Sequence, residues 1–518
     1  METKHSTTSA GPPPMSALFP KWGVSIKFLI HFLNSPKMKQ PMHELAGFTR
    51  AEIDAQDLLT LRTICREYRV LATDGMTDTL EFAIYDGTET KPKEYFVDAL
   101  CQLPTTMAHV CFCIVKPETK KLNGSYAEKI ILKGLHPEWV GKPTDFCSHV
   151  WKSSFKDFVE SLVAEDNERQ KSRLGRMGTE QKTSASASDG SETRYYWNDV
   201  FVIDENQTDK FPKEYFYTTF RDAVGSIGRT LLVMGSLKNA KPLTRAWCIW
   251  EIFCTIDSGG ELAIVMPPAA RMELKTMLLD DFDEVIKIIM GVKTQNSKAF
   301  SEYDLKEIHR IVRETCKGGF NGVDGAVCAG LSEWLGNTAM KFVDMESEDK
   351  GMLGLMNQVA TLLQQQGKLD EAEPLFRRCL AVQEKLLGAE HPSTLISINN
   401  LAQLLSDQGK RDEAEPLFRR CLAVTEKLLG VGHPSTLISI NNLAQLLSDQ
   451  GKRDEAEPLY RRCLTVTEKL LGAEHPRTLT TINNFSVTAR HRRSRGSASS
   501  HLPCCFRSDA KLLMVWSV

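Results

Sequence analysis

The sequence predicts a multidomain protein, in which an α/β domain with a parallel sheet is followed by an all-α solenoid. Two observations support this prediction. Strand-like and helix-like segments alternate between residues 143 and 270, as in domains with parallel strands. Further along the chain, Gly367, Gly409 and Gly451 are 42 residues apart, with nearly identical helix pairs between them. A chain of 518 residues can hold about two to four domains with full-sized cores.

The composition argues against several classes of partner. The formal net charge is −2, so neither nucleic acid nor an anionic membrane is expected as the main partner. The longest apolar run, at 28–33, is too short to span a membrane, and the first residues lack the pattern of a signal or transit peptide. These features indicate a cytoplasmic protein. The 14 cysteines are scattered, so we expect reduced thiols, no metal site and no bound cofactor.

The first 135 residues divide into two predicted regions. Residues 1–20 are rich in Pro, Ser and Thr and are predicted to be disordered. Residues 21–135 form a mixed region to which the sequence assigns no function. Within this region we expect a strand at 79–85, a helix at 51–70, and a helix at 105–116 that is capped by Thr105 or Thr106.

Residues 136–340 are predicted to form the α/β domain, and residues 341–352 a linker. The segment 166–194 is polar and of low complexity, so we expect a flexible insertion there. The expected strands are 143–151, 195–203, 230–235 and 262–267. The expected helices are 152–162, 213–227, 244–256, 271–290, 301–315 and 326–335.

Residues 353–487 are predicted to be an array of helix pairs, followed by an irregular basic and apolar tail at 488–518. Gly409 is expected to end a first helix, because a residue that can adopt positive φ satisfies the last carbonyl groups. Asp412 is expected to cap the second helix, and Glu415 to complete a capping box. Stacked units of this kind present an extended surface, which predicts protein binding.

The repeated strings INNLAQLLSDQGKRDEAEPLFRRCL and HPSTL resemble the tetratricopeptide repeats of kinesin light chains and nephrocystin-type proteins. In that family the first helices line a concave groove that holds extended peptides of a partner. The resemblance implies that equivalent carboxamides face the groove: Asn357, Asn399, Asn441 and Asn483, with Gln403 and Gln445 one turn further on. Carboxamides suit this purpose because they donate to and accept from a peptide backbone.

The same asparagines could instead hydrogen-bond between units and set the superhelix, so both interpretations stay open. A kinesin light chain also carries a long heptad segment before its repeats, and no such heptads are seen here. A role as a kinesin-light-chain-like cargo adaptor of a motor is therefore only the second alternative for function.

A second resemblance lies in the α/β segment. TDFCSHVWKSSFKDFVESL resembles the opening strand and helix of TIR domains, and TRAWCIWEI contains the Trp-Cys-x-x-Glu motif of that family. In this chain the motif residues are Trp247, Cys248 and Glu251. The resemblance covers roughly residues 143–270 and implies a flavodoxin-like parallel sheet.

Some TIR domains cleave NAD at the nicotinamide–ribose bond, and the resemblance implies that Glu251 would be the catalytic carboxylate. A carboxylate stabilises the positive charge that develops on the ribose. Ser148, His149, Trp151 and Trp247 are expected to line the pocket, while Trp197 and Asp199 are weaker candidates. Alternatively, the tryptophans pack in the core, His149 is structural, and Glu251 pairs with Arg245 or a lysine.

The sequence therefore favours an interaction scaffold with a TIR-like module that serves signalling or self-association, including homo-oligomer formation. The first alternative is a TIR-type NAD hydrolase, with NAD as its substrate, that is regulated through the repeats.

Overall fold

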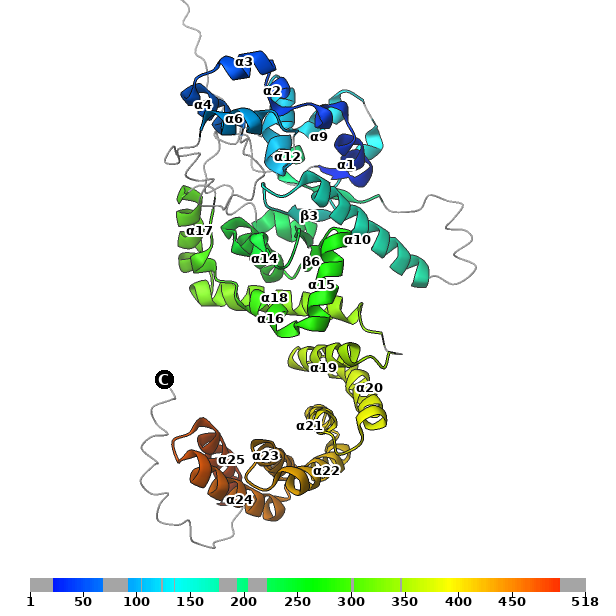
Figure 1. Cartoon of the computed structure of the whole chain (residues 1–518), viewed down its shortest axis with the longest axis vertical. Coiled ribbons are helices and arrows are strands. Elements are labelled where there is room, and N and C mark those ends of the chain that lie inside the picture. The colour runs from blue at the N-terminus through cyan, green and yellow to red at the C-terminus, as the bar shows by residue number, and fades with distance from the viewer. Residues whose placement is uncertain are drawn as a thin grey trace, which may run out of the picture. The chain divides into compact units, whose positions relative to one another are not determined.

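The computed structural model describes residues 22–68, 92–176, 193–203, 221–299, 302–344 and 347–493, apart from the single residues 104, 123 and 135. The chain divides into two compact units, Met1–Phe342 and Val343–Val518 (Figure 1). The predicted disordered segment 1–20, the predicted strand 79–85 and most of the predicted tail lie outside the described residues.

The first unit is built on a six-stranded sheet with the order β2-β1-β4-β3-β5-β6. The strands are β1 (Gly23–Ser25), β2 (Val140–Gly141), β3 (Asp145–Ser148), β4 (Tyr195–Trp197), β5 (Arg229–Val233) and β6 (Glu261–Val265). Strands β4, β3, β5 and β6 lie next to one another in that order and are all parallel. Strand β1 is antiparallel to both of its neighbours, β2 and β4. The sheet is therefore mixed, and the expectation of an all-parallel sheet is corrected.

The antiparallel edge depends on two glycines. A Cβ at Gly23 would lie 3.0 Å from the Tyr195 carbonyl carbon, and a Cβ at Gly141 would overlap the Tyr195 ring. Residues 23 and 141 thus lie so close to Tyr195 of β4 that only glycine, which has no side chain, fits at these two positions. The central strands β3 and β5 are buried at every position, as expected for parallel strands covered on both faces.

Helices follow the strands in the order that the sequence predicts. They are α10 (Phe155–Arg176), α12 (Asp199–Val202), α14 (Ala246–Asp257), α15 (Pro268–Asp280), α16 (Phe282–Met290), α17 (Glu302–Thr315) and α18 (Gly319–Met340), with short 3₁₀ turns at Lys241–Thr244 and Thr294–Asn296. The strand predicted at 195–203 ends at Trp197, because Asn198 precedes the short helix α12. Of the helix predicted at 213–227, the described part covers 221–227 and is helical.

Helix α10 continues through Arg176, so the predicted flexible insertion does not begin at residue 166. Polar residues in this part of the helix have defined partners. Arg169 bonds to Glu165 at 3.0 Å and to Glu261 of β6 at 2.9 Å, while Glu168 accepts from Arg271 and Lys341. A polar helix can therefore be stable here, because ion pairs attach it to neighbouring elements.

Residues 22–139 contribute short helices. These are α1 (Ile26–Leu33), α2 (Met42–Leu45), α3 (Arg50–Ala55), α4 (Leu58–Tyr68), α6 (Lys93–Leu100), α7 (Met107–His109), α8 (Lys116–Thr119) and α9 (Tyr126–Leu132), with 3₁₀ turns η2 (Pro36–Lys39) and η4 (Pro137–Trp139) and a π-helix, η3 (Val110–Val115). The helix predicted at 51–70 is split into α3 and α4. Thr106 caps α7 as expected, accepting from the His109 N–H.

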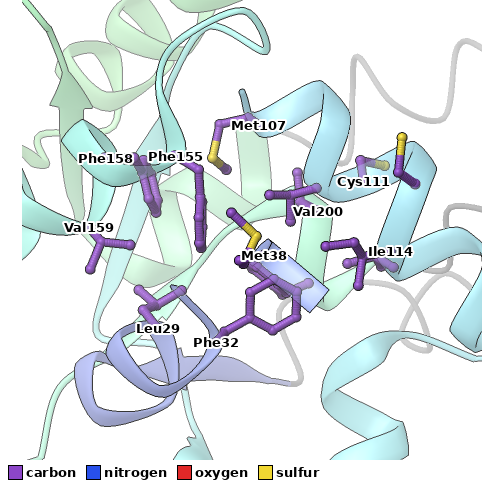
Figure 2. Packing of buried hydrophobic residues seen from close by; sticks show 14 of the residues in the cluster. Leu29, Phe32, Met38, Met107, Cys111, Ile114, Phe155, Phe158, Val159 and Val200 are labelled. Carbon is purple, nitrogen blue, oxygen red and sulfur yellow. The ribbon is translucent and has the colours of Figure 1, made fainter. Parts of the chain in front are cut away.

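One hydrophobic core joins the parts that the sequence analysis divides at residue 135. Leu29 and Phe32 of α1 pack with Phe155 and Val159 of α10 (Figure 2). The rings of Phe32 and Phe155 meet edge to face with centroids 5.8 Å apart. Because β1 also belongs to the sheet, residues 22–135 are part of the α/β unit rather than a separate region.

The second unit is an array of antiparallel helices. They are α19 (Lys350–Gln365), α20 (Leu369–Leu387), α21 (Pro392–Asp407), α22 (Arg411–Leu429), α23 (Pro434–Asp449), α24 (Arg453–Leu471) and α25 (Pro476–Arg493). Figure 1 shows α21, α23 and α25 on the inside of the curve of this array and α22 and α24 on its outside. The first helix of each pair thus faces inward.

Gly409 has φ +80 and follows the end of α21, as predicted. The capping prediction for α22 is wrong, because Lys410 occupies the N-cap position and Asp412 lies inside the first turn. The turn is tight, with the Lys410 N–H bonded to the Leu405 carbonyl, and so the second helix starts earlier than expected. Glu415 instead accepts from Arg419 at 2.8 Å and from Lys452 of the next unit at 2.7 Å.

Candidate functional site

Polar side chains gather in the first unit where the strand order reverses. The chain runs from β3 to β4 on one side and then crosses to β5 on the other side. In open sheets of this type, the crevice for a ligand forms at the carboxyl ends of the strands flanking such a point. Ser148 ends β3 and His149 follows it, Asn198 directly follows β4, and Glu251 projects from α14.

His149 is held between two residues that follow β4. The Asn198 amide nitrogen lies 3.3 Å from His149 Nδ1, and Asp199 Oδ1 lies 3.7 Å from His149 Nε2. Because an amide N–H donates to Nδ1, the neutral ring carries its proton on Nε2, which faces the Asp199 carboxylate. Trp151 Nε1 donates to the other oxygen of Asp199 at 2.9 Å. The β3–α10 loop and the start of α12 are therefore joined through this carboxylate.

Four buried polar atoms in this cluster have no hydrogen-bond partner among the described residues: Ser148 Oγ, His149 Nε2, Asn198 Oδ1 and Glu251 Oε2. Asn198 is fully buried, and Glu251 is only 9% exposed. A buried polar atom without a partner costs roughly 1–3 kcal/mol, so several in one place are unusual in a purely structural cluster. We name these four residues the polar cluster.

Burial raises the pKa of Glu251 to about 8, and the charge of Asp199 acts in the same direction. The nearby Ser148 hydroxyl lowers this pKa, although its Oγ makes no hydrogen bond of ordinary geometry. The Glu251 carboxyl is therefore mainly protonated at neutral pH. Cys248, on the same helix, donates to the His149 carbonyl at 3.5 Å, and burial raises its pKa, so it is an inert thiol.

The other residues expected at the pocket have different positions. Trp151 adjoins the cluster through Asp199, whereas Trp197 is 2% exposed and stacks on Phe146 with centroids 4.8 Å apart, which is a core role. Trp247 lies in the first turn of α14 and is half-buried. Glu251 makes no ion pair with Arg245 or a lysine among the described residues.

Asn198 was not predicted as a site residue from the sequence. Its signal was present, since it is a polar residue directly after the apolar string YYW. Its proximity to His149, however, depends on β4 pairing with β3, which places residues 49 positions apart side by side.

The N-terminal helices hold the loop that carries Trp151. The Ala108 N–H donates to the Trp151 carbonyl at 2.8 Å, and the Phe155 N–H donates to the Thr105 carbonyl at 2.8 Å. The Phe112 ring packs on Trp151 with centroids 5.6 Å apart. The segment 105–115 thus fixes the loop 149–154 next to the polar cluster.

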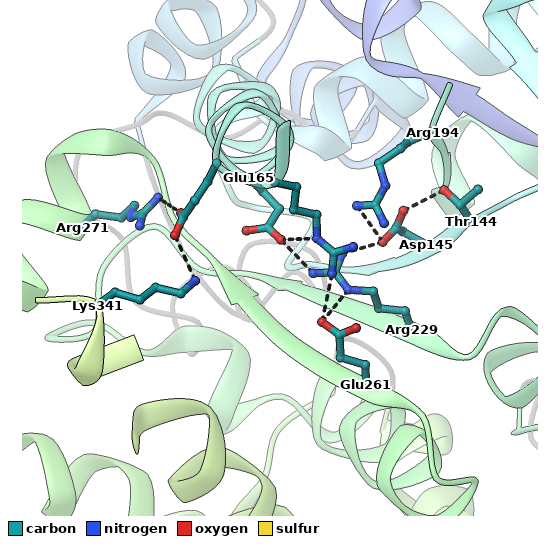
Figure 3. Close-up of polar contacts among 10 residues, drawn as sticks. Thr144, Asp145, Glu165, Arg194, Arg229, Glu261, Arg271 and Lys341 are labelled. Carbon is teal, nitrogen blue, oxygen red and sulfur yellow. Dashed lines mark hydrogen bonds and ion pairs between the residues drawn. The ribbon is translucent and has the colours of Figure 1, made fainter. Parts of the chain in front are cut away.

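A charged network occupies the opposite ends of the strands (Figure 3). Arg229 of β5 bonds to Asp145 of β3 at 2.6 Å, to Glu165 of α10 at 2.7 Å and to Glu261 of β6 at 2.9 Å. Arg194 adds a contact to Asp145 at 3.5 Å. The opposite charges of these residues offset one another, and we assign them a structural role.

The array carries the second set of expected site residues on its inner helices. Asn357 donates to Ser397 Oγ at 3.1 Å, and Asn442 donates to Asn399 Oδ1 at 3.0 Å. Gln403 and Gln445 are exposed, as is Asn483, while Asn357, Asn399 and Asn441 are partly exposed. Some amide groups are therefore engaged between units, and others face outward from α21, α23 and α25.

Comparison with known proteins identifies the repeats. Residues 351–427, 396–469 and 435–502 each match the family model described as tetratricopeptide repeat. The array consists of tetratricopeptide repeats. No curated protein matches the chain. The resemblance of the first unit to TIR domains stays a prediction.

The solved structures that are similar to the chain include the following three. Two, one of them a point variant of the other, are of a putative kinesin light chain with nearly identical TPR-like repeats from Podosopora anserina. Each of the two is 26% identical to this chain, with a TM-score of 0.29, and each match covers 41% of this chain. The match covers 91% of the point variant and 92% of the other structure. The third is BtubC (BKLC) from P. vanneervenii, with 16% identity, a TM-score of 0.27, and coverage of 45% of this chain and 95% of that one.

The tetratricopeptide array is also linked along its surface by charge pairs that recur from unit to unit. Lys410 and Lys452 each bond to a glutamate of the preceding unit, Glu373 and Glu415, at 2.7 Å. Arg377 and Arg419 form ion pairs with Glu413 and Glu455 of the next unit.

Among the described residues, no helix is both long and apolar enough to cross a membrane.

Proposed function

We propose that the chain is a protein-interaction scaffold whose tetratricopeptide array holds an extended segment of a partner along its inner helices. The observation that carries this proposal is the recurrence of exposed amides on α21 and α23. Gln403 and Gln445 are one unit apart and exposed, and each donates to an aspartate of its own helix, while Gln445 also accepts from Tyr460. Their amide N–H groups can turn to a peptide backbone at little cost, because these surface bonds contribute little to stability.

The test is selection of peptides from a random library displayed on phage, with the full-length chain as bait. We expect selected peptides to lose binding to the double variant Gln403→Ala/Gln445→Ala. The matched control is Lys385→Ala/Lys427→Ala, which removes exposed side chains from the outer helices. Failure to select any peptide, or equal binding to both double variants, would refute the proposal.

As a second candidate function, we propose that the first unit cleaves NAD. The observation that favours it is the polar cluster, in which Glu251 lies with Ser148, His149 and Asn198. Cleavage breaks the bond between ribose C1′ and the nicotinamide nitrogen, whose electron pair leaves with nicotinamide, while water adds to C1′ and releases a proton. An ionised Glu251 would stabilise the positive charge on the ribose. The positive nicotinamide ring of NAD would itself favour ionisation of a carboxyl whose pKa is about 8.

The test is release of nicotinamide from NAD by the purified full-length chain, at concentrations high enough to permit self-association through the first unit. We expect turnover by the wild type and by Glu284→Gln, a variant of an exposed glutamate on α16, but none by Glu251→Gln. Absence of turnover in all three folded proteins would exclude this activity and leave the first unit as a non-enzymatic module for signalling or self-association.

A further inference from the structure

The inner helices α21 and α23 have the same sixteen-residue sequence, PSTLISINNLAQLLSD. Each exposes a large apolar side chain near its start: Ile396 is 59% exposed and Ile438 is 44% exposed. Their neighbours in sequence, Leu395 and Leu437, are both 6% exposed and belong to the core. Packing within the array therefore covers only about half of each isoleucine, and the rest of the side chain is free to contact a ligand.

Each isoleucine opens a stripe along its helix. On α21 the stripe consists of Ile396, Asn399, Gln403 and Asp407, at helical spacings of three and four residues. On α23 it consists of Ile438, Asn441, Gln445 and Asp449. We name these two rows the inner stripes. Within Pro392–Asp407 and Pro434–Asp449 there is no lysine or arginine, so the only charges on these helices are negative.

The distance between the stripes follows from how the helices pack. Asn442 of α23 bonds directly to Asn399 of α21, and Gln364 of α19 bonds to Asp407 of α21 at 2.6 Å. Helices whose side chains touch in this way have axes about 8–10 Å apart. Ile396 and Ile438 occupy equivalent positions, so a ligand meets the same apolar contact again after about 8–10 Å.

This repeat selects the conformation of a bound peptide. In a β-strand, side chains on one face recur after roughly 7 Å, or after roughly 13 Å if one is skipped. In a polyproline II helix, every third side chain lies on the same face, about 9 Å from the last. Of these two extended conformations, polyproline II has the spacing that agrees with the distance between the stripes.

We propose that the inner stripes bind a peptide in the polyproline II conformation, with an apolar side chain at every third position and basic residues between them. This inference rests on the scaffold function proposed above and adds the chemistry of the partner. The apolar side chains contact Ile396 and Ile438, the carboxamides contact the peptide backbone, and Asp407 and Asp449 attract the basic residues. The preformed conformation lowers the entropy lost on binding.

The test measures binding of labelled synthetic peptides to the full-length chain by fluorescence anisotropy. The probe peptide repeats Leu-Pro-Lys, and two comparison peptides of the same length place leucine at every second or every fourth position, with proline and lysine between. We expect the probe to bind at least about tenfold more tightly than either comparison peptide. Equal affinity of the three would overturn the inference.

Variants test the assignment to the stripes. Ile396→Ser/Ile438→Ser should weaken binding of the probe by roughly tenfold for each isoleucine, because each substitution removes an exposed apolar contact for the peptide. Leu386→Ser/Leu428→Ser is the matched control, because these outer-helix leucines are 52% and 47% exposed. An equal effect of both pairs would also overturn the inference.

Failure of this inference differs from failure of the scaffold function. If library peptides bind the chain through Gln403 and Gln445 but the Leu-Pro-Lys peptide does not, the polyproline II assignment is refuted and the scaffold function stands. If neither library nor synthetic peptides bind, both are refuted.

Discussion

Burial of Glu251 makes the free energy of unfolding depend on pH. Its folded-state pKa of about 8 lies above the ordinary value of 4.5, so the folded protein holds this proton more tightly than the unfolded chain does. The stability that this difference contributes is fully present below about pH 4.5 and is lost as the pH rises through about 8.

We therefore expect the variant Glu251→Gln, which cannot ionise, to become more stable relative to the wild type as the pH rises from about 4.5 to 8. The shift corresponds to roughly 5 kcal/mol at most. Urea denaturation at several pH values measures this, and Glu284→Gln serves as the control. A stability difference that does not change with pH would contradict the buried protonated carboxyl.

The positive charge of Arg229 offsets the negative charge of Asp145, a carboxylate that water cannot reach. Asp145 is fully buried, and the guanidinium is 8% exposed. The variant Arg229→Met should lower the free energy of unfolding by about 3–5 kcal/mol, because it leaves a buried charge unpaired. Arg169→Met, whose side chain is 37% exposed, should cost less than about 1 kcal/mol. Chemical denaturation compares the two, and similar losses would show that the network acts as a surface feature.

At the scale of elements, η3 and the β3–α10 loop form one structural piece. Phe112→Ala removes the ring that packs on Trp151 and should loosen this contact. We expect faster hydrogen exchange at the amides of Ala108 and Phe155, which bond across the two segments. Tyr303→Ala, which truncates an aromatic residue that is 45% exposed on α17, should leave both amides unchanged. If exchange at these amides is the same in both variants, Phe112 does not hold the loop.

The repeats contain two glycines with opposite expected responses to alanine. Gly409 has φ +80, so Gly409→Ala should destabilise the array by about 1 kcal/mol through backbone strain, although its Cβ would meet nothing within 4 Å. Gly354 lies inside α19, also with no atom within 4 Å of a Cβ, so Gly354→Ala should stabilise by about 0.5–1 kcal/mol. Thermal denaturation of the full-length variants decides the sign of each effect.

At the scale of the whole molecule, the first unit should not tolerate division at the boundary that the sequence suggested. A fragment of residues 136–342 would lack β1 and the α1 side chains Phe28, Leu29 and Phe32, which are all buried. We expect this fragment to be unfolded, and a fragment of residues 1–342 to be folded. Circular dichroism and hydrogen exchange of the two fragments measure this, and a folded 136–342 fragment would contradict the shared core.

The sequence alone determined the features that are local or periodic. The repeat length, the helix pairs and the turn at Gly409 follow from self-similarity, because each unit packs only against its neighbours. The strands and helices from β3 to β6 also follow from runs of apolar residues. Ser148, His149 and Glu251 could be predicted as candidate site residues from motifs in two short segments of the sequence.

Only the tertiary structure decided what depends on contacts between distant residues. The pairing of β1 with β4, the core shared with residues 22–135 and the continuation of α10 through its ion pairs all join segments far apart in sequence. Asn198 meets His149 only because β4 lies beside β3, and the inner stripes become a repeated surface only because the helices stack. Such contacts are set by the burial of whole faces, which no single segment of the sequence encodes.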